Sequence, residues 1–152
     1  MKERFTSWSG RRAGRNHLFL FFLPDPEFIS DGTSTGEVVA GGAAFELRYT
    51  WSHDGKANEG ILLFCAAENG AATCAWVDSW HQSASIMQFA GTYTEEAGFA
   101  VSGSYPAPEG PDWGWRITLR READNSLVLD MTNITPDGEE SPAVHVIYAP
   151  VE

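Results

Sequence analysis

The feature that most constrains the fold of this chain is the recurrence of turn dipeptides at strand-length intervals. Asp54-Gly55, Asn69-Gly70 and Asp137-Gly138 are pairs that favour tight turns with positive φ. Helical periodicity is almost absent between them. Runs of strand length occupy residues 17–23, 35–40, 43–52, 58–66, 72–80, 84–93, 98–104, 113–121, 126–133 and 143–149. About ten short strands joined by close turns predict an all-β fold, an antiparallel barrel or sandwich.

Several of these runs alternate between large apolar and polar side chains, as strands with one buried face do. In the third run, Phe45, Leu47, Tyr49 and Trp51 share one face, and Arg48 lies on the other. The eighth run repeats the pattern, with Trp113, Trp115, Ile117 and Leu119 against Gly114, Arg116, Thr118 and Arg120. Both runs therefore predict strands that cover an apolar interior.

The turns also predict how neighbouring strands pair. If Asp54-Gly55 and Asn69-Gly70 are both two-residue turns, Tyr49 faces Gly60 and Leu63 faces Trp76. We expect the face with Glu46 and Arg48 to be external, because buried charges need partners. Trp76 and Asp78 then lie on this external face. The predicted internal face holds Phe45, Leu47, Tyr49, Trp51, Leu62, Phe64, Val77, Ser79 and His81.

The same register places Cys65 directly opposite Cys74, close enough for a disulfide. Reducing compartments keep such thiols free, and small buried cysteines are common. We therefore expect reduced thiols, with a disulfide as the alternative.

Length and charge limit the partners of this chain. Its 152 residues predict one domain over 1–152, with a basic N-terminal arm at 1–16 that we interpret as a solvated start to the fold. The formal net charge is -11. A body so acidic repels phosphate backbones and anionic lipids, so we expect neither nucleic acid nor membrane as a partner.

The apolar run 18–23 is too short for a secretion signal, and we expect a cytoplasmic protein.

The chemistry of catalysis is only weakly indicated. Asp78, Ser79 and His81 are the three residue types of a hydrolase triad. Ser79 and His81 would stand roughly 6–7 Å apart on a strand, however, which is too far for a hydrogen bond. The histidines, His17, His53, His81 and His145, have no metal-binding spacing, so we expect no metal. No cofactor is predicted, although an axial histidine for haem, His81 or His145, remains an alternative.

Several motifs resemble those of an uncharacterised bacterial family of small proteins of unknown function. The resemblance extends from about residue 41 to residue 148. It is carried by Arg48-Tyr49-Thr50-Trp51, Asp54-Gly55, Glu59-Gly60, Trp76-x-Asp78-Ser79-Trp80-His81, Gly103-Ser104-Tyr105, Pro111-Asp112-Trp113-Gly114-Trp115-Arg116 and Met131-Thr132-Asn133-Ile134-x-Pro136. That family is grouped with calycin-like barrels, similar to lipocalins and fatty-acid-binding proteins. The resemblance implies an up-and-down barrel with a central cavity, and no established activity.

We therefore expect a barrel that binds a small apolar or amphipathic ligand in a central cavity. Two alternatives remain. One is an enzyme with a polar cluster of Asp78, His81 and Arg116 at the cavity mouth. The other is a structural module that forms a homodimer through an exposed face bearing Trp76 and Trp80. The predicted ligand-binding residues are Tyr49, Trp51, Trp76, Asp78, Ser79, His81, Trp115 and Arg116.

Overall fold

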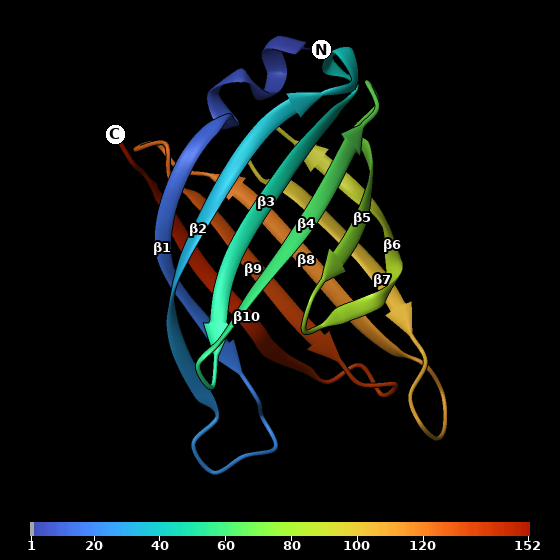
Figure 1. Cartoon of the computed structure of the whole chain (residues 1–152). Coiled ribbons are helices and arrows are strands. Elements are labelled where there is room, and N and C mark those ends of the chain that lie inside the picture. Colours follow the sequence, from blue (N-terminus) through green and yellow to red (C-terminus); the bar gives the residue numbers. More distant parts are fainter. Residues whose placement is uncertain (1) are drawn as a thin grey trace.

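The computed structural model describes residues 2–152, with the side chains of Lys2, Glu3 and Ser83 left aside. Ten strands make up almost the whole chain (Figure 1). They are β1 (Gly10–Phe19), β2 (Glu27–Val39), β3 (Ala44–His53), β4 (Lys56–Ala66), β5 (Ala71–Asp78), β6 (Gln82–Thr94), β7 (Gly98–Tyr105), β8 (Trp113–Arg121), β9 (Leu127–Ile134) and β10 (Glu140–Pro150). Two short 3-10 helices, η1 (Lys2–Trp8) and η2 (Ala40–Gly42), complete the described elements.

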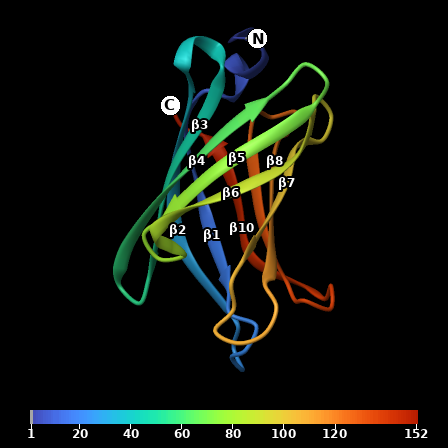
Figure 2. The ribbon, with the colours of Figure 1, turned by 90° about the vertical axis from the view of Figure 1, so that its right-hand side faces the viewer.

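Each strand pairs antiparallel with its neighbours in sequence, and β1 pairs with β10 to close the barrel. The two views of the ribbon show the strands tilted around a common axis (Figures 1 and 2). The prediction of an up-and-down barrel of about ten strands is therefore confirmed. Among the described residues, no helix is long and apolar enough to cross a membrane.

The predicted alternation of β3 and β8 is present in the barrel wall. Phe45, Leu47, Tyr49 and Trp51 are buried inside, whereas Arg48 is exposed outside. On β8, Ile117 and Leu119 are likewise buried. Large side chains at alternate positions fill the barrel because successive strand residues point to opposite faces.

The prediction of a solvated N-terminal arm is wrong. η1 buries Phe5 and Trp8, and β1 begins at Gly10 and pairs with both β2 and β10. The predicted first strand, 17–23, overlaps only the end of β1. Residues 10–15 are polar and glycine-rich, so their pattern is not typical of a strand. Closure of the barrel supplies their hydrogen-bond partners on both sides.

The predicted register is correct for one hairpin and wrong for the next. Tyr49 faces Gly60 across the turn at Asp54-Gly55, where both residues have positive φ, as a two-residue turn requires. At Asn69-Gly70 only the glycine has positive φ. Ala67 N–H bonds to Ala71 O, which makes a three-residue loop. The extra residue shifts the register by one, so Leu62, not Leu63, faces Trp76.

This shift reverses the predicted faces of β5, because a one-residue slip exchanges the two sides of a strand. Trp76 and Asp78 are buried inside the barrel, while Ser79 is exposed outside and Val77 is half-buried in the outer wall. The cysteines are not opposite each other. Phe64 faces Cys74, Cys65 is exposed, and both thiols are free.

The two ends of the barrel differ in how they are filled. At the end where the chain begins, the rings of Phe5 and Trp8 pack against Phe45, Tyr93 and Phe99, with centroids 5.4–6.1 Å apart. We call this the closed end; in Figure 1 it is the upper end, beneath η1.

Arg12 holds η1 at the closed end through hydrogen bonds. Its guanidinium is buried and donates to the carbonyl oxygens of Ser7, Trp8 and Asn125 and to the Asn125 side chain. Burial, together with the neighbouring Arg121, lowers its pKa. A buried cation whose donors are occupied by carbonyls holds the helix in place.

Candidate functional site

The other end of the barrel holds a cavity of about 670 Å³. We call this the open end. Five loops surround it, because alternate connections of an up-and-down barrel lie at the same end: residues 20–26, 54–55, 79–81, 106–112 and 135–139. The lining is mostly apolar and aromatic, and comprises Leu18, Phe19, Leu20, Phe21, Phe22, Trp80, His81, Tyr105, Ala107, Pro108, Glu109, Trp113, Trp115, Asn133, Pro142 and Ala143.

A smaller hollow of about 170 Å³ lies next to the cavity, further along β5 and β6. His81, Tyr105 and Trp115 line both spaces, and Trp76 and Met87 line only the smaller one. Tyr105 is held in place by its hydroxyl, which donates to Asn133 Oδ1 at 2.5 Å. The two spaces are therefore separated by a few aromatic side chains.

Asp78 is the centre of a buried hydrogen-bond network beside this hollow. Its carboxylate is 1% exposed. Oδ2 accepts from the Tyr49 hydroxyl at 2.6 Å and from Trp51 Nε1 at 3.2 Å. Oδ1 accepts from the backbone N–H groups of Trp80 and His81 at 2.8 and 2.9 Å. Four donors offset the cost of burying this charge, and they fix the loop at 79–81 against the wall.

Tyr49 extends the network along the inner wall, from β3 over β4 to β5. Its hydroxyl accepts from Trp76 Nε1 at 2.8 Å while it donates to Asp78. Burial and the adjacent Asp78 raise the Tyr49 pKa well above its ordinary value. The ring crosses Gly60, where an added Cβ would lie 2.3 Å from the phenol. Glycine at this position is required for Tyr49 to reach the carboxylate.

His81 lies among four tryptophan rings. Its ring centroid is 5.4 Å from Trp51, 5.5 Å from Trp76, 4.7 Å from Trp80 and 5.7 Å from Trp115. Desolvation lowers its pKa to about 4, although Asp78 acts in the opposite direction. The imidazole is therefore neutral at pH 7, with one nitrogen able to donate and the other able to accept.

Three buried polar atoms have no hydrogen-bond partner among the described residues: Ser34 Oγ, Trp115 Nε1 and Tyr148 Oη. Burial and the nearby Asp78 raise the pKa of Tyr148, so its hydroxyl keeps its proton. Trp115 is the one of the three that lines the cavity. Because that nitrogen is itself buried, the donor that can reach a bound molecule is the N–H of His81, whose ring lines both spaces.

The structure brings six of the eight predicted site residues together. They are Tyr49, Trp51, Trp76, Asp78, His81 and Trp115. Ser79 is not among them: it points outward, where its hydroxyl donates to Asn58 and accepts from the backbone of Glu59. The one-residue shift at Asn69-Gly70 explains this difference.

Arg116 is also outside the barrel. It alternates with the inward-facing Trp115 and Ile117, and it pairs with Glu140 at 2.5 Å. That pairing raises its pKa. The predicted cluster of Asp78, His81 and Arg116 is therefore not assembled at the mouth.

The dimer and haem alternatives depend on the positions of Trp76, His81 and His145. Trp76 is 2% exposed, so it cannot contribute to the predicted dimer face. His145 lies on the outer wall with Asp130, 2.6 Å away, which leaves His81 as the interior histidine of the two considered for haem. No group of three metal-ligating side chains occurs among residues 2–152 apart from the side chains left aside.

Sequence reasoning missed much of the cavity wall. Leu18, Leu20 and Phe22 come from the short apolar run that was compared with a secretion signal. Ala107 and Pro108 come from the proline-rich segment between the runs predicted at 98–104 and 113–121. An apolar run that continues beyond the end of a strand was a usable signal, because a solvated loop has no need of such side chains.

Fold and site together define a closed ten-stranded barrel with one filled end and one cavity-bearing end. The chain belongs to a family described as proteins of unknown function, DUF1579, which matches residues 23–149. The crystal structure of Rv2717c from M. tuberculosis is similar, with a TM-score of 0.71 at 13% identity, over 99% of this chain and 96% of that one. That likeness concerns the fold alone. No curated protein matches the sequence.

Proposed function

We propose that the protein binds a small apolar or amphipathic molecule in the cavity at the open end. The observation that carries this proposal is a 670 Å³ cavity whose wall is mostly aromatic and aliphatic. Ligand cavities in proteins typically have about 300–1,000 Å³ and a few polar groups among apolar walls. His81 and Asn133 supply such groups here.

The packing of the wall supports the same proposal. Phe21 and Phe22 are 52% and 69% exposed, and Trp80 is 42% exposed, although all three line the cavity. Large apolar side chains left in contact with water cost free energy, roughly 25 cal/mol per Å² that a ligand could cover. A bound apolar molecule would shield these rings, which gives binding its driving force.

Nile red, an uncharged apolar dye, tests the proposal directly. We expect saturable binding of one dye per chain, with enhanced dye emission and quenching of tryptophan fluorescence. Ala143 lines the cavity and is buried, so Ala143→Phe should fill part of the space and weaken binding at least tenfold.

Ala90→Phe is the matched control, because Ala90 is exposed on the outer face of β6. It adds the same ring without entering the barrel and should leave dye binding unchanged. Absence of saturable binding, or equal loss in the two variants, would contradict the proposal.

Native mass spectrometry of freshly purified protein, compared with a denatured run, addresses the natural ligand. An additional mass that is lost on denaturation would identify its class. An absorbance spectrum of the same sample tests for haem held by His81, which would appear as a Soret band.

We also propose that the protein acts in the cytoplasm. The exposed free thiol of Cys65 supports this location, since an exposed thiol is prone to oxidation outside a reducing compartment. Fractionation of the source cells would test it.

A further inference from the structure

We propose that the cavity takes an uncharged amphiphile with a hydrogen-bond acceptor in its polar group, and that it rejects the corresponding carboxylate. This inference rests on the proposed function and names the chemical class of the ligand. It is carried by the charges that line the cavity, by those around its mouth, and by the neutral donor in its wall, the imidazole of His81.

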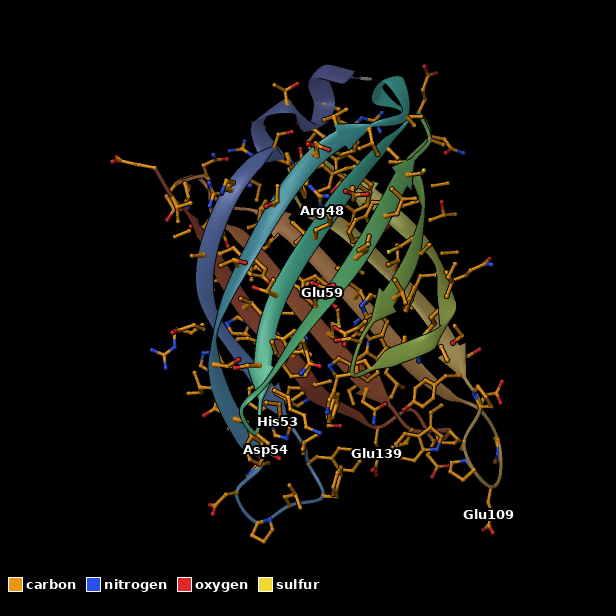
Figure 3. All side chains as sticks on the ribbon, viewed as in Figure 1. Arg48, His53, Asp54, Glu59, Glu109 and Glu139 are labelled. Atoms are coloured by element: carbon orange, nitrogen blue, oxygen red, sulfur yellow. The ribbon has the colours of Figure 1, made fainter. Side chains whose placement is uncertain are left out.

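The cavity wall contains no cation to pair with an anionic ligand. Of the described residues that line it, none is lysine or arginine, and Glu109 is the one with a formal charge. Figure 3 shows Glu109 at the tip of the loop between β7 and β8, pointing away from the barrel. His81 is neutral at pH 7, and Arg12 is engaged at the closed end. A carboxylate drawn inside would lose its hydration without gaining a partner.

The loops around the mouth add repulsion. The loops 20–26, 54–55, 79–81, 106–112 and 135–139 contain no lysine or arginine. Figure 3 shows Asp54, Glu109 and Glu139 at this same end. The exposed carboxylates of the five loops are Asp25, Asp54, Glu109, Asp112, Asp137 and Glu139. Lys56 follows one of these loops and leaves the excess of negative charge in place. Such a field lowers the local concentration of anions.

Apart from Glu109, which points away from the barrel, the described wall holds no carboxylate to pair with a cation either. Asp78 is the buried carboxylate of this region, and its two oxygens already accept four hydrogen bonds. It does not line the cavity or the smaller hollow. The donor in the wall is the neutral imidazole of His81, which lines both spaces. A carbonyl or ether oxygen satisfies such a donor at no cost of burying a charge.

The test is displacement of Nile red at pH 8 by decanamide and by decanoate, which have the same chain and head groups of nearly the same size. We expect decanamide to displace the dye at a concentration at least tenfold lower. Added salt should strengthen decanoate binding, because it screens the rim carboxylates, and should leave decanamide unchanged.

Each outcome either supports or overturns the inference. Equal or tighter binding of decanoate overturns the inference and leaves the proposed function intact. Decylammonium binding more than tenfold tighter than decanamide also overturns it, in favour of a cationic ligand. If Nile red binds and neither decanamide nor decanoate displaces it, the inference fails. If Nile red itself does not bind, the proposed function fails first.

Two double variants separate the rim from overall charge. Glu109→Gln with Asp112→Asn removes two carboxylates beside the cavity, and should strengthen decanoate binding two- to fivefold. Glu95→Gln with Glu96→Gln makes the same change in net charge in the exposed loop after β6, at the closed end. This control should leave decanoate binding unchanged. Equal effects of the two pairs would contradict a role for the rim.

Discussion

The closed and open ends of this barrel use the same kinds of side chain for different purposes. At the closed end, Phe5 and Trp8 are 2% and 4% exposed, and they fill the space between opposite strands. At the open end, Trp80 and Phe22 are 42% and 69% exposed beside an unfilled cavity. Aromatic rings at the closed end thus pack the interior, whereas those at the open end form an apolar surface that borders the cavity.

The difference arises from how each end is covered. η1 lies across the closed end and is held by the buried donors of Arg12. At the open end, the comparable buried polar group is Asp78, which fixes the loop 79–81 to the wall and leaves the mouth uncovered. The buried charge of Arg12 holds η1 over the closed end, and the buried charge of Asp78 holds the loop 79–81 against the cavity wall. Substitutions at the two ends should therefore separate stability from binding.

The largest expected effect on stability is that of Trp8→Ala. Truncation of a fully buried aromatic residue typically lowers the free energy of unfolding by about 3–5 kcal/mol. Urea denaturation would measure it. Trp113→Ala at the open end should cost only about 1 kcal/mol, because Trp113 is half-buried and borders a cavity. Equal losses would show that the two ends are packed alike.

Asp78→Asn should lower the free energy of unfolding by about 3 kcal/mol. The asparagine NH2 group would face at least one N–H or O–H group that now donates to the carboxylate, and two donors cannot bond to each other. The same urea titration applies. Asp112→Asn, at an exposed position, should change stability by less than about 0.5 kcal/mol. A small effect of Asp78→Asn would indicate that the network does not stabilise the open end.

The pH dependence of stability should report on His81. Its folded-state pKa of about 4 lies below the unfolded value near 6.5, so the unfolded chain binds more protons between these pH values. Stability should therefore fall as the pH decreases from 6.5 to 4, by at most ~3 kcal/mol from this group. His81→Gln should reduce that fall, and His145→Gln on the outer wall is the control. An unchanged profile in His81→Gln would refute the low pKa.

The smallest effects compare two buried tyrosines. Tyr49→Phe removes a hydroxyl with two hydrogen-bond partners and should cost about 2 kcal/mol. Tyr148→Phe removes a hydroxyl with none among the described residues, so stability should change by less than about 0.5 kcal/mol or rise slightly. Thermal unfolding of the pair would measure the difference. A substantial loss in Tyr148→Phe would reveal a partner for that hydroxyl, such as a buried water.

The fold was largely predictable because alternation and turn dipeptides are local signals. β3 and β4 pair as expected, since Asp54-Gly55 adopts the positive φ values that its composition favours. Asn69-Gly70 has a similar composition but forms a three-residue loop. Nothing local distinguishes these two uses of a glycine turn, and the choice decides whether Asp78 or Ser79 faces the interior.

The cavity was less predictable, because it depends on residues that are distant in sequence. The cluster around His81 combines β3, β5 and β8, and could be anticipated only in part from aromatic content. β1 was missed because residues 10–15 have no strand-like pattern and form a strand only through closure of the barrel. The filling of one end by η1 likewise depends on tertiary contacts of Phe5 and Trp8.

The most direct test of the binding account is a titration of ¹⁵N-labelled protein with decanamide, followed through the six indole N–H signals in NMR spectra. The tryptophans report on both ends of the barrel at once. We predict that the signals of Trp113 and Trp115 shift saturably with the same dissociation constant, while that of Trp8 stays in place. Shifts of Trp8 as large as those of Trp115, or no saturable shift at any indole, would contradict the account.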